Sequence, residues 1–432
     1  MKSFLRALPL GLALSITALP AGGQEPGVPR LSLDEVIRRA VLHAPAMAQA
    51  EGGVRNAEMG RRSATASFLP SLSVSSGASL SSSERFNPTT NTSVTGSNDS
   101  YNAGMNASVD LFTGGRKTAE LHSARAGLES AEAGAREQRF AVVLSAKQAY
   151  YAVLRGGELI RVAEAGVRRA EESLEAARTR LAVGSATRSD VLRGELALNE
   201  ARQTLLQEEN DRRVATFALG RLVGADGPVE AEPVETGAEP LPLEREELLQ
   251  LALEQSPRVV AAQAGVRSGE AGVRVARAQY FPSLRASSGY NWFNQDPAFT
   301  GGRSSWSLGL GVSLPVFNGL QREASIVRSQ VQEEVAQAQL ADARRQTRAD
   351  VERLAGAVEV AAQRVVLTRE ALAMAEEDLR VQRERYRLGA TTILELITSE
   401  NNLIQAENTD VFARYDYQIA RAQLEALVGR EL

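Results

Sequence analysis

The sequence predicts a mainly α-helical protein with a small β part, built from long antiparallel helical hairpins and an internal two-fold repeat. Three observations support this fold class. Apolar residues recur at alternating spacings of three and four, the same pattern returns 205 residues later, and the segments in between alternate apolar with small polar residues. The first pattern is typical of packed helices and the last of β-strands.

The longest helical pattern runs from Gly319 to Arg387, a stretch that contains no proline. Its seam residues are Val351, Leu354, Val358, Ala361, Val365, Thr368, Leu372, Ala375, Leu379, Gln382 and Tyr386. A second seam continues from Leu396 to Leu427, after the short segment Leu388–Thr392. A period of 3.5 keeps one helix face against a partner along its whole length, so the two seams predict a supercoiled αα-hairpin.

The first half of the chain repeats this hairpin. Gly389 lies 205 residues after Gly184, and Leu427-Val428-Gly429 lies 205 residues after Leu222-Val223-Gly224. A register held without a gap over a whole hairpin indicates internal duplication. Alternate seam positions of the first copy are small, which predicts closely spaced helix axes; they are Ala149, Gly156, Ala163, Ala170 and Ala177.

The repeat sets the expected organisation of the chain. The first repeat spans 24–224, with a β-hairpin at 71–111 and a helical hairpin at 116–223; a linker at 225–242 leads to the second repeat at 243–432, with a β-hairpin at 284–314 and a helical hairpin at 319–428. Each repeat opens with a helix that is interrupted before a proline, at Ala44-Pro45 and Ser256-Pro257. We expect these shorter helices to stack end to end with the second hairpin arm beside the long helix.

Residues 1–23 combine Lys2 and Arg6 with an apolar run and a small-residue end, as in a cleaved secretory signal peptide. No later run reaches the ~18 apolar residues of a transmembrane helix. The net charge of −4 offers no basic excess for nucleic acid, and the absence of cysteine excludes thiol chemistry and disulfides. His43 and His122 are isolated, and HExxH, GxSxG and P-loop motifs are absent, so we expect no enzyme activity, metal or cofactor.

The strand patterning lies between the helices. Residues 101–111, 284–292 and 306–314 alternate apolar with small polar residues, and 71–83 alternates weakly. The polar loops Glu84–Asp99 and Asn294–Arg303 are expected to face water outside the cell. Aromatic residues near the strand ends are expected to mark a membrane interface, with ordinary strand propensity as the alternative; they are Tyr101, Tyr290, Trp292 and Trp306.

Four strands in one chain cannot close a barrel, because known transmembrane barrels begin at about eight strands and open edges are not tolerated in lipid. Several copies must therefore pool their strands. A dimer supplies eight strands and a homotrimer twelve. The small inward-facing Ser and Gly residues favour an open lumen, and hence a trimeric 12-stranded transmembrane β-barrel that an α-barrel tunnel continues.

In this order the elements resemble the TolC-type outer-membrane efflux proteins over nearly the whole chain after residue 23. The resemblance rests on the paired segments Leu69–Leu72 and Phe281–Leu284, on Pro315–Gly319, and on the turns Val183–Thr187 and Leu388–Thr392. It implies a passive exit duct of a tripartite efflux or type I secretion system. Such a homotrimer lies in outer membrane lipid, extends into the periplasm, and binds a periplasmic adaptor (membrane fusion) protein and an inner-membrane pump.

A second hypothesis, from another class, is a soluble periplasmic coiled-coil adaptor without a membrane barrel. The alternating strands with tryptophan argue against it. The sequence does not distinguish drugs, metals, proteins and siderophores as cargo.

The resemblance also implies functional residues near the two helical turns. The adaptor-docking turns comprise Gly184, Ser185, Ala186, Thr187, Gly389, Ala390, Thr391 and Thr392, and the pore constriction comprises Asp190, Glu395 and Thr398. The capping-box patterns Thr187-x-x-Asp190 and Thr392-x-x-Glu395 offer a second, compatible interpretation of the two acids.

Two positions depart from the family pattern. Thr398 replaces the second acidic residue and Thr391 replaces an arginine, which weakens the case for a double carboxylate ring or an arginine latch; Arg188 is a candidate substitute. We also expect Gly184 and Gly389 to end their helices in the left-handed conformation.

Overall fold

The computed structural model describes residues 28–89, 91–97, 99–234, 237, 244–298 and 300–430. The predicted signal peptide at 1–23 lies outside these ranges. Of the predicted linker at 225–242, residues 235–236 and 238–242 also lie outside them. Within the described ranges, no helix combines the length and the apolar character needed to cross a membrane.

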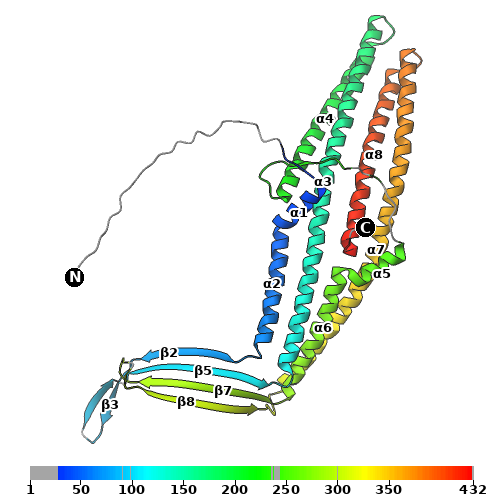
Figure 1. Cartoon of the computed structure of the whole chain (residues 1–432). Helices are drawn as coiled ribbons and strands as arrows, with labels where there is room; N and C mark the ends of the chain where they lie inside the picture. Colours follow the sequence, from blue (N-terminus) through cyan, green and yellow to red (C-terminus); the bar gives the residue numbers. More distant parts are fainter. Residues whose placement is uncertain are drawn as a thin grey trace, which may run out of the picture.

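Helices make up most of the chain (Figure 1). The first repeat contains α1 (Leu33–His43), α2 (Pro45–Ala66), α3 (Arg116–Ala182) and α4 (Arg188–Leu222). The second contains α5 (Arg245–Gln255), α6 (Pro257–Arg277), the 3-10 helix η1 (Ala278–Tyr280), α7 (Gln321–Arg387) and α8 (Ile393–Val428). The expected breaks before Pro45 and Pro257 are confirmed, and the first helical hairpin begins at the expected residue, Arg116.

The two long helices have 67 residues each, so each is about 100 Å long. The predicted end-to-end stacking is confirmed: α2 and α4 follow one another along α3, and α6 and α8 along α7 (Figure 1). Because α3 also packs against α6 and α8, the repeats join into one layer. Its order is α2–α3–α6–α7 near the sheet and α4–α3–α8–α7 at the far end.

The core lies in the seams between these helices. None of the predicted seam residues of α7 and α8 is exposed. On α3, buried alanines recur at every seventh position; they are Ala119, Ala126 and Ala133, then Ala163, Ala170 and Ala177. The expected close approach of helix axes is confirmed at Gly156 and Gly194, where an added Cβ would lie 3.2 Å from side-chain carbons of Arg212 and Leu174.

Four antiparallel strands form the main sheet in the order β2 (Ser71–Ser79), β5 (Ser100–Phe112), β7 (Ser283–Asn294) and β8 (Arg303–Ser313). The four strands predicted for the main sheet are therefore confirmed, and the central β5–β7 pair joins the two repeats.

The prediction of a plain loop at Glu84–Asp99 is wrong, because β3 (Ser82–Asn87) and β4 (Thr92–Ser97) pair there as a hairpin. The segment Ser82–Ser97 is mostly polar, so its sequence shows no regular alternation of apolar and polar residues. The two-residue strands β1 (Arg30–Leu31) and β6 (Glu230–Ala231) also pair, in parallel, and are too short to give a periodic signal.

The strand register sorts side chains onto two faces. Val74, Met105, Tyr290 and Trp306 form one row across all four strands, and Ser73, Asn106, Gly289 and Ser307 form the adjacent row. Since neighbouring residues of a strand point to opposite sides, the first row marks an apolar face and the second a polar face. The small residues of the polar face leave room beside the sheet.

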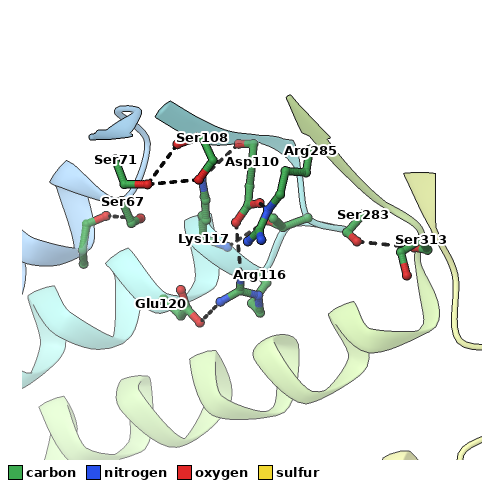
Figure 2. A network of polar contacts seen from close by, with 12 residues as sticks. Ser67, Ser71, Ser108, Asp110, Arg116, Lys117, Glu120, Ser283, Arg285 and Ser313 are labelled. Carbon is green, nitrogen blue, oxygen red and sulfur yellow. Dashed lines mark hydrogen bonds and ion pairs between the residues drawn. The ribbon is translucent and has the colours of Figure 1, made fainter. Parts of the chain in front are cut away.

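Where the sheet meets the helices, a buried cation fixes the joint. Lys117, the second residue of α3, is 7% exposed. Its Nζ donates a hydrogen bond to the backbone oxygen of Asp110 at 2.9 Å (Figure 2). The same Nζ lies 5.7 Å from the ring centre of Phe68, just after α2. The side chain thus ties the end of β5, the start of α3 and the end of α2 together.

The second repeat builds the same joint with Arg322, which lies 205 residues after Lys117 and is 9% exposed. Its guanidinium donates to the backbone oxygens of Pro315 at 2.8 Å and Val316 at 3.2 Å, and it stacks 4.5 Å from the ring centre of Tyr280. In both repeats the cation reaches back seven residues and packs on the aromatic residue that follows the shorter helix. We call the two cations the joint clamps.

Removing either clamp should destabilise the protein. A hydrogen bond from a charged group contributes about 1.5–3 kcal/mol. Since Arg322 makes two such bonds and Lys117 one, Arg322→Met should lower the thermal midpoint more than Lys117→Met. Thermal unfolding of the detergent-solubilised protein, followed by circular dichroism, measures both. Arg322→Lys, which keeps a cation, should fall between Arg322→Met and wild type; equal midpoints for all variants would contradict the clamp.

Candidate functional site: the helical tip

The two helical turns lie at the end of the layer remote from the sheet (Figure 1). Gly184 and Gly389 have φ of +74° and +78°, so the predicted left-handed helix ends are confirmed. Gly389 N donates to Tyr386 O at 3.0 Å and Ala390 N to Arg385 O at 2.8 Å, the pattern of a Schellman cap. Gly184 and Ser185 make the same two bonds, to Leu181 and Arg180.

Both turns rest on one apolar core. Buried Leu174 and Val191 from the first hairpin pack with Leu379, Tyr386 and Ile393 from the second. The ends of the two helical hairpins are therefore packed together through this shared core.

Arg180 links the two turns directly, and the sequence alone did not indicate it. Its Nη1 donates to the backbone oxygen of Tyr386, its guanidinium lies 4.6 Å from the centre of the Tyr386 ring, and its Nη2 donates to Ser185 O at 3.4 Å. Burial raises the pKa of the Tyr386 hydroxyl. Among the described residues, Arg385, at the matching position of the second repeat, donates only within its own hairpin, to Ala390 O and Gln382.

Asp190 completes a capping box at the start of α4. Its Oδ2 accepts from the backbone N–H and the hydroxyl of Thr187, both at 2.8 Å, while its own N–H donates to the Thr187 hydroxyl at 3.3 Å. The bond from the Thr187 backbone N–H, followed by that from its hydroxyl, lowers the pKa of Asp190. Nη1 of Arg193 lies 3.7 Å from its Oδ1, so Arg193 forms an ion pair with Asp190.

Glu395 forms only half of a capping box. Its N–H donates to the Thr392 hydroxyl at 3.3 Å, but its carboxylate accepts from the hydroxyl of Thr391. Thr398 is exposed and its hydroxyl donates to Leu394 O at 2.8 Å within α8. The capping interpretation is thus confirmed for Asp190 and in part for Glu395. A pore role for these residues stays a prediction.

The predicted docking turns are largely exposed. Val183 and Leu388, which precede the two glycines, are 75% and 74% exposed. The docking residues predicted from the sequence did not include them, although their spacing of 205 residues marks them as equivalent. Two exposed apolar side chains at the end of the helical hairpins are typical of a surface that contacts another protein.

The predicted interface aromatics share the apolar face of the sheet. Tyr290 and Trp306 are directly opposite one another and are 49% and 79% exposed, and Trp292 and Tyr101 continue this face toward the strand ends remote from the helices. A second exposed group lies at the joint end and was not predicted, because it falls where alternation stops; it comprises Phe112, Phe281 and Phe317.

Among the residues that the structure describes, no group of three or more His, Asp or Glu side chains is placed to hold a metal ion. The tip instead presents backbone turns, apolar side chains and capped carboxylates.

Comparison with known proteins identifies the family of this chain. The outer membrane efflux protein family matches residues 36–225 and 248–430, once for each repeat. The chain belongs to the outer membrane efflux protein family. This efflux protein is 29% identical to the pyoverdine export outer membrane protein OpmQ of Pseudomonas aeruginosa over 92% of this chain and 83% of the relative. It is 30% identical to Protein CyaE of Bordetella pertussis over 92% and 84%.

Solved structures agree on the fold. A crystal structure of CusC superposes with a TM-score of 0.81 at 21% identity and covers 92% of both chains. The outer membrane protein VceC of Vibrio cholerae gives 0.77 at 21% identity, over 93% of this chain and 97% of that one. The family is one of channel proteins, which favours the efflux channel over the soluble adaptor hypothesis. This efflux protein is therefore an outer-membrane channel-tunnel that extends into the periplasm.

Proposed function

We propose that three copies of the chain close into one 12-stranded barrel and a continuous helical tunnel, the exit duct of a tripartite system. The open edges of the single-chain sheet support this most strongly. The edge strands β2 and β8 each have one partner, and every residue of both is exposed. Such edges are tolerated in lipid only if they pair with another strand.

The helical layer has open edges too. On α7, Val360, Leu367 and Met374 follow one another at spacings of seven and are 64–70% exposed. The opposite edge, α4, also exposes apolar residues, without the regular spacing of α7; they comprise Leu192, Leu196, Leu206, Val214 and Phe217. An apolar stripe with heptad spacing is a coiled-coil seam that needs a partner. Pairing α7 of one copy with α4 of the next extends the layer into a ring.

Native mass spectrometry in mild detergent should give a mass about three times that of the chain. Replacing Leu367 and Met374 together by glutamate should shift the population toward monomer, because each subunit interface would bury new charges. A monodisperse wild-type monomer that retains its β-sheet signal would rule the assembly out.

Outer membrane efflux proteins work with an adaptor and an inner-membrane pump, and we infer that this adaptor docks on the turns Val183–Thr187 and Leu388–Thr392. The exposed Val183 and Leu388 support this. The shared core beneath the turns would hold both contacts in a fixed relation.

Gly389→Val should abolish efflux and adaptor cross-linking but leave outer-membrane insertion intact. A left-handed φ costs a side chain about 1–2 kcal/mol, and more if it is β-branched, so the turn must change shape. Efflux assays and adaptor cross-linking in cells measure the effect. Gly389→Asn is the matched control, because asparagine tolerates this conformation. Normal cross-linking in the valine variant would argue against docking at this turn.

We also propose that Asp190 and Glu395, in three copies each, narrow the periplasmic entrance near the tunnel axis. Like charges held close need water, cations or partners to stay ionised. Arg193 and the Thr187 backbone supply partners for Asp190, whereas Glu395 is exposed. The ring would attract cations, and Glu395 would contribute most to it.

Converting Asp190 to Asn and Glu395 to Gln together should raise single-channel conductance or reduce cation selectivity and block by multivalent cations. Stability should fall by less than about 1 kcal/mol, since amides still cap. Glu352→Gln with Glu359→Gln is the control: it removes the same charge from α7 where both side chains pair with Arg245. An unchanged channel in the tip double variant would leave helix capping as the only role of these acids.

A further inference from the structure

Around Asp110, the joint between sheet and helices carries more cationic side chains than carboxylates. On the polar face, Nε of Arg285 donates to Asp110 Oδ1 at 2.6 Å, yet this side chain is 64% exposed. In the part of the chain that the structure describes, its terminal amino groups make no hydrogen bond. Arg116 donates to Glu120 at 2.7 Å and lies 4.0 Å from Asp110. With Lys117, three cations face two carboxylates (Figure 2).

A cavity of about 570 Å³ opens beside these groups. Its polar lining includes Asp110, Arg116 and Arg285, and Phe281 supplies part of an apolar wall. This volume lies within the range of small-molecule sites.

Gly311 keeps the cavity open. It is the cross-strand neighbour of Arg285, and no described atom lies within 4 Å of the place where its Cβ would be. Because Gly311 lines the cavity, most other side chains at this position would take up part of its volume. The exposed amino groups of Arg285 therefore face unoccupied volume on the polar side of the sheet.

We propose that this cavity binds an organic carboxylate with an apolar body, and so forms a cargo-contact site at the base of the barrel. The planar guanidinium of Arg285 matches a carboxylate in two parallel hydrogen bonds, and Arg116 adds a second positive charge. Phe281 offers a surface for the apolar part. Asp110 holds Arg285 in place through Nε and leaves its terminal amino groups for the ligand. The cargo role rests on the proposed trimer, because the polar face lines a lumen only in a closed assembly.

Isothermal titration of the purified full-length protein in detergent tests the site with 2-naphthoate as the probe. We expect saturable binding of 2-naphthoate and none of 2-naphthamide, which has the same shape without the charge. Arg285→Gln should weaken 2-naphthoate binding at least about tenfold, the order expected when a charge-assisted pair is lost. Arg285→Lys, which keeps the charge beside Asp110, should weaken it less and guards against a folding defect.

Arg303→Gln is the matched control. Arg303 is exposed on the same face of the sheet, opposite Phe293 at the other end of β8, so its replacement removes the same charge from the lumen surface. Binding should be unchanged. Equal losses in the Arg285 and Arg303 variants, full binding in Arg285→Gln, or equal binding of the amide would each overturn the site.

A planar-bilayer recording then separates the site from the assembly. If both proposals hold, 2-naphthoate interrupts the wild-type current and fails to interrupt that of Arg285→Gln. Binding without any channel would count against the proposed assembly and leave the site standing. Normal channels without 2-naphthoate binding would overturn the site alone.

Discussion

The packing of small residues along α3 positions almost everything else in the chain. This helix contacts α2 and α4 of its own repeat and α6 and α8 of the other, so it joins elements of both repeats along its whole length. Alanine at every seventh buried position lets these neighbours approach closely. Larger residues there would push helices of both repeats apart at once. The sheet depends on the same helix, because Lys117 at its start holds the end of β5.

Much of this fold could be predicted from the sequence because it is periodic and repeated. The heptad seams predicted the hairpins, and the first hairpin begins at the expected residue, Arg116. The hairpin β3–β4 was not predicted because its mostly polar sequence shows no regular alternation. The joint clamps were not predicted for a different reason: the contact of a cation with a backbone oxygen seven residues earlier depends on tertiary geometry. The equivalence of Lys117 and Arg322 was nevertheless visible in their spacing of 205 residues.

The candidate tip shows the same division. Glycine chemistry predicted both left-handed turns, and the capping pattern predicted the Thr187–Asp190 box. The link from Arg180 to Tyr386 could not be read from local sequence, since Arg180 and Arg385 occupy equivalent positions and only one reaches the other repeat. Sequence identity between the repeats thus hides a structural asymmetry, which arises because each hairpin has a different neighbour.

The equal length of α3 and α7 has a consequence for how such a protein can change in size. The spacing between equivalent residues is 212 at Pro70 and Pro282 but 205 at Lys117 and Arg322, so the repeats differ by seven residues, all within the strands and their loops. A loop facing water can gain or lose residues alone. A long helix cannot, because its seam, its two end-to-end partners and its counterpart in the other repeat would fall out of step. The shaft can therefore lengthen only by whole heptads added to both repeats together, while the distal loops diversify freely.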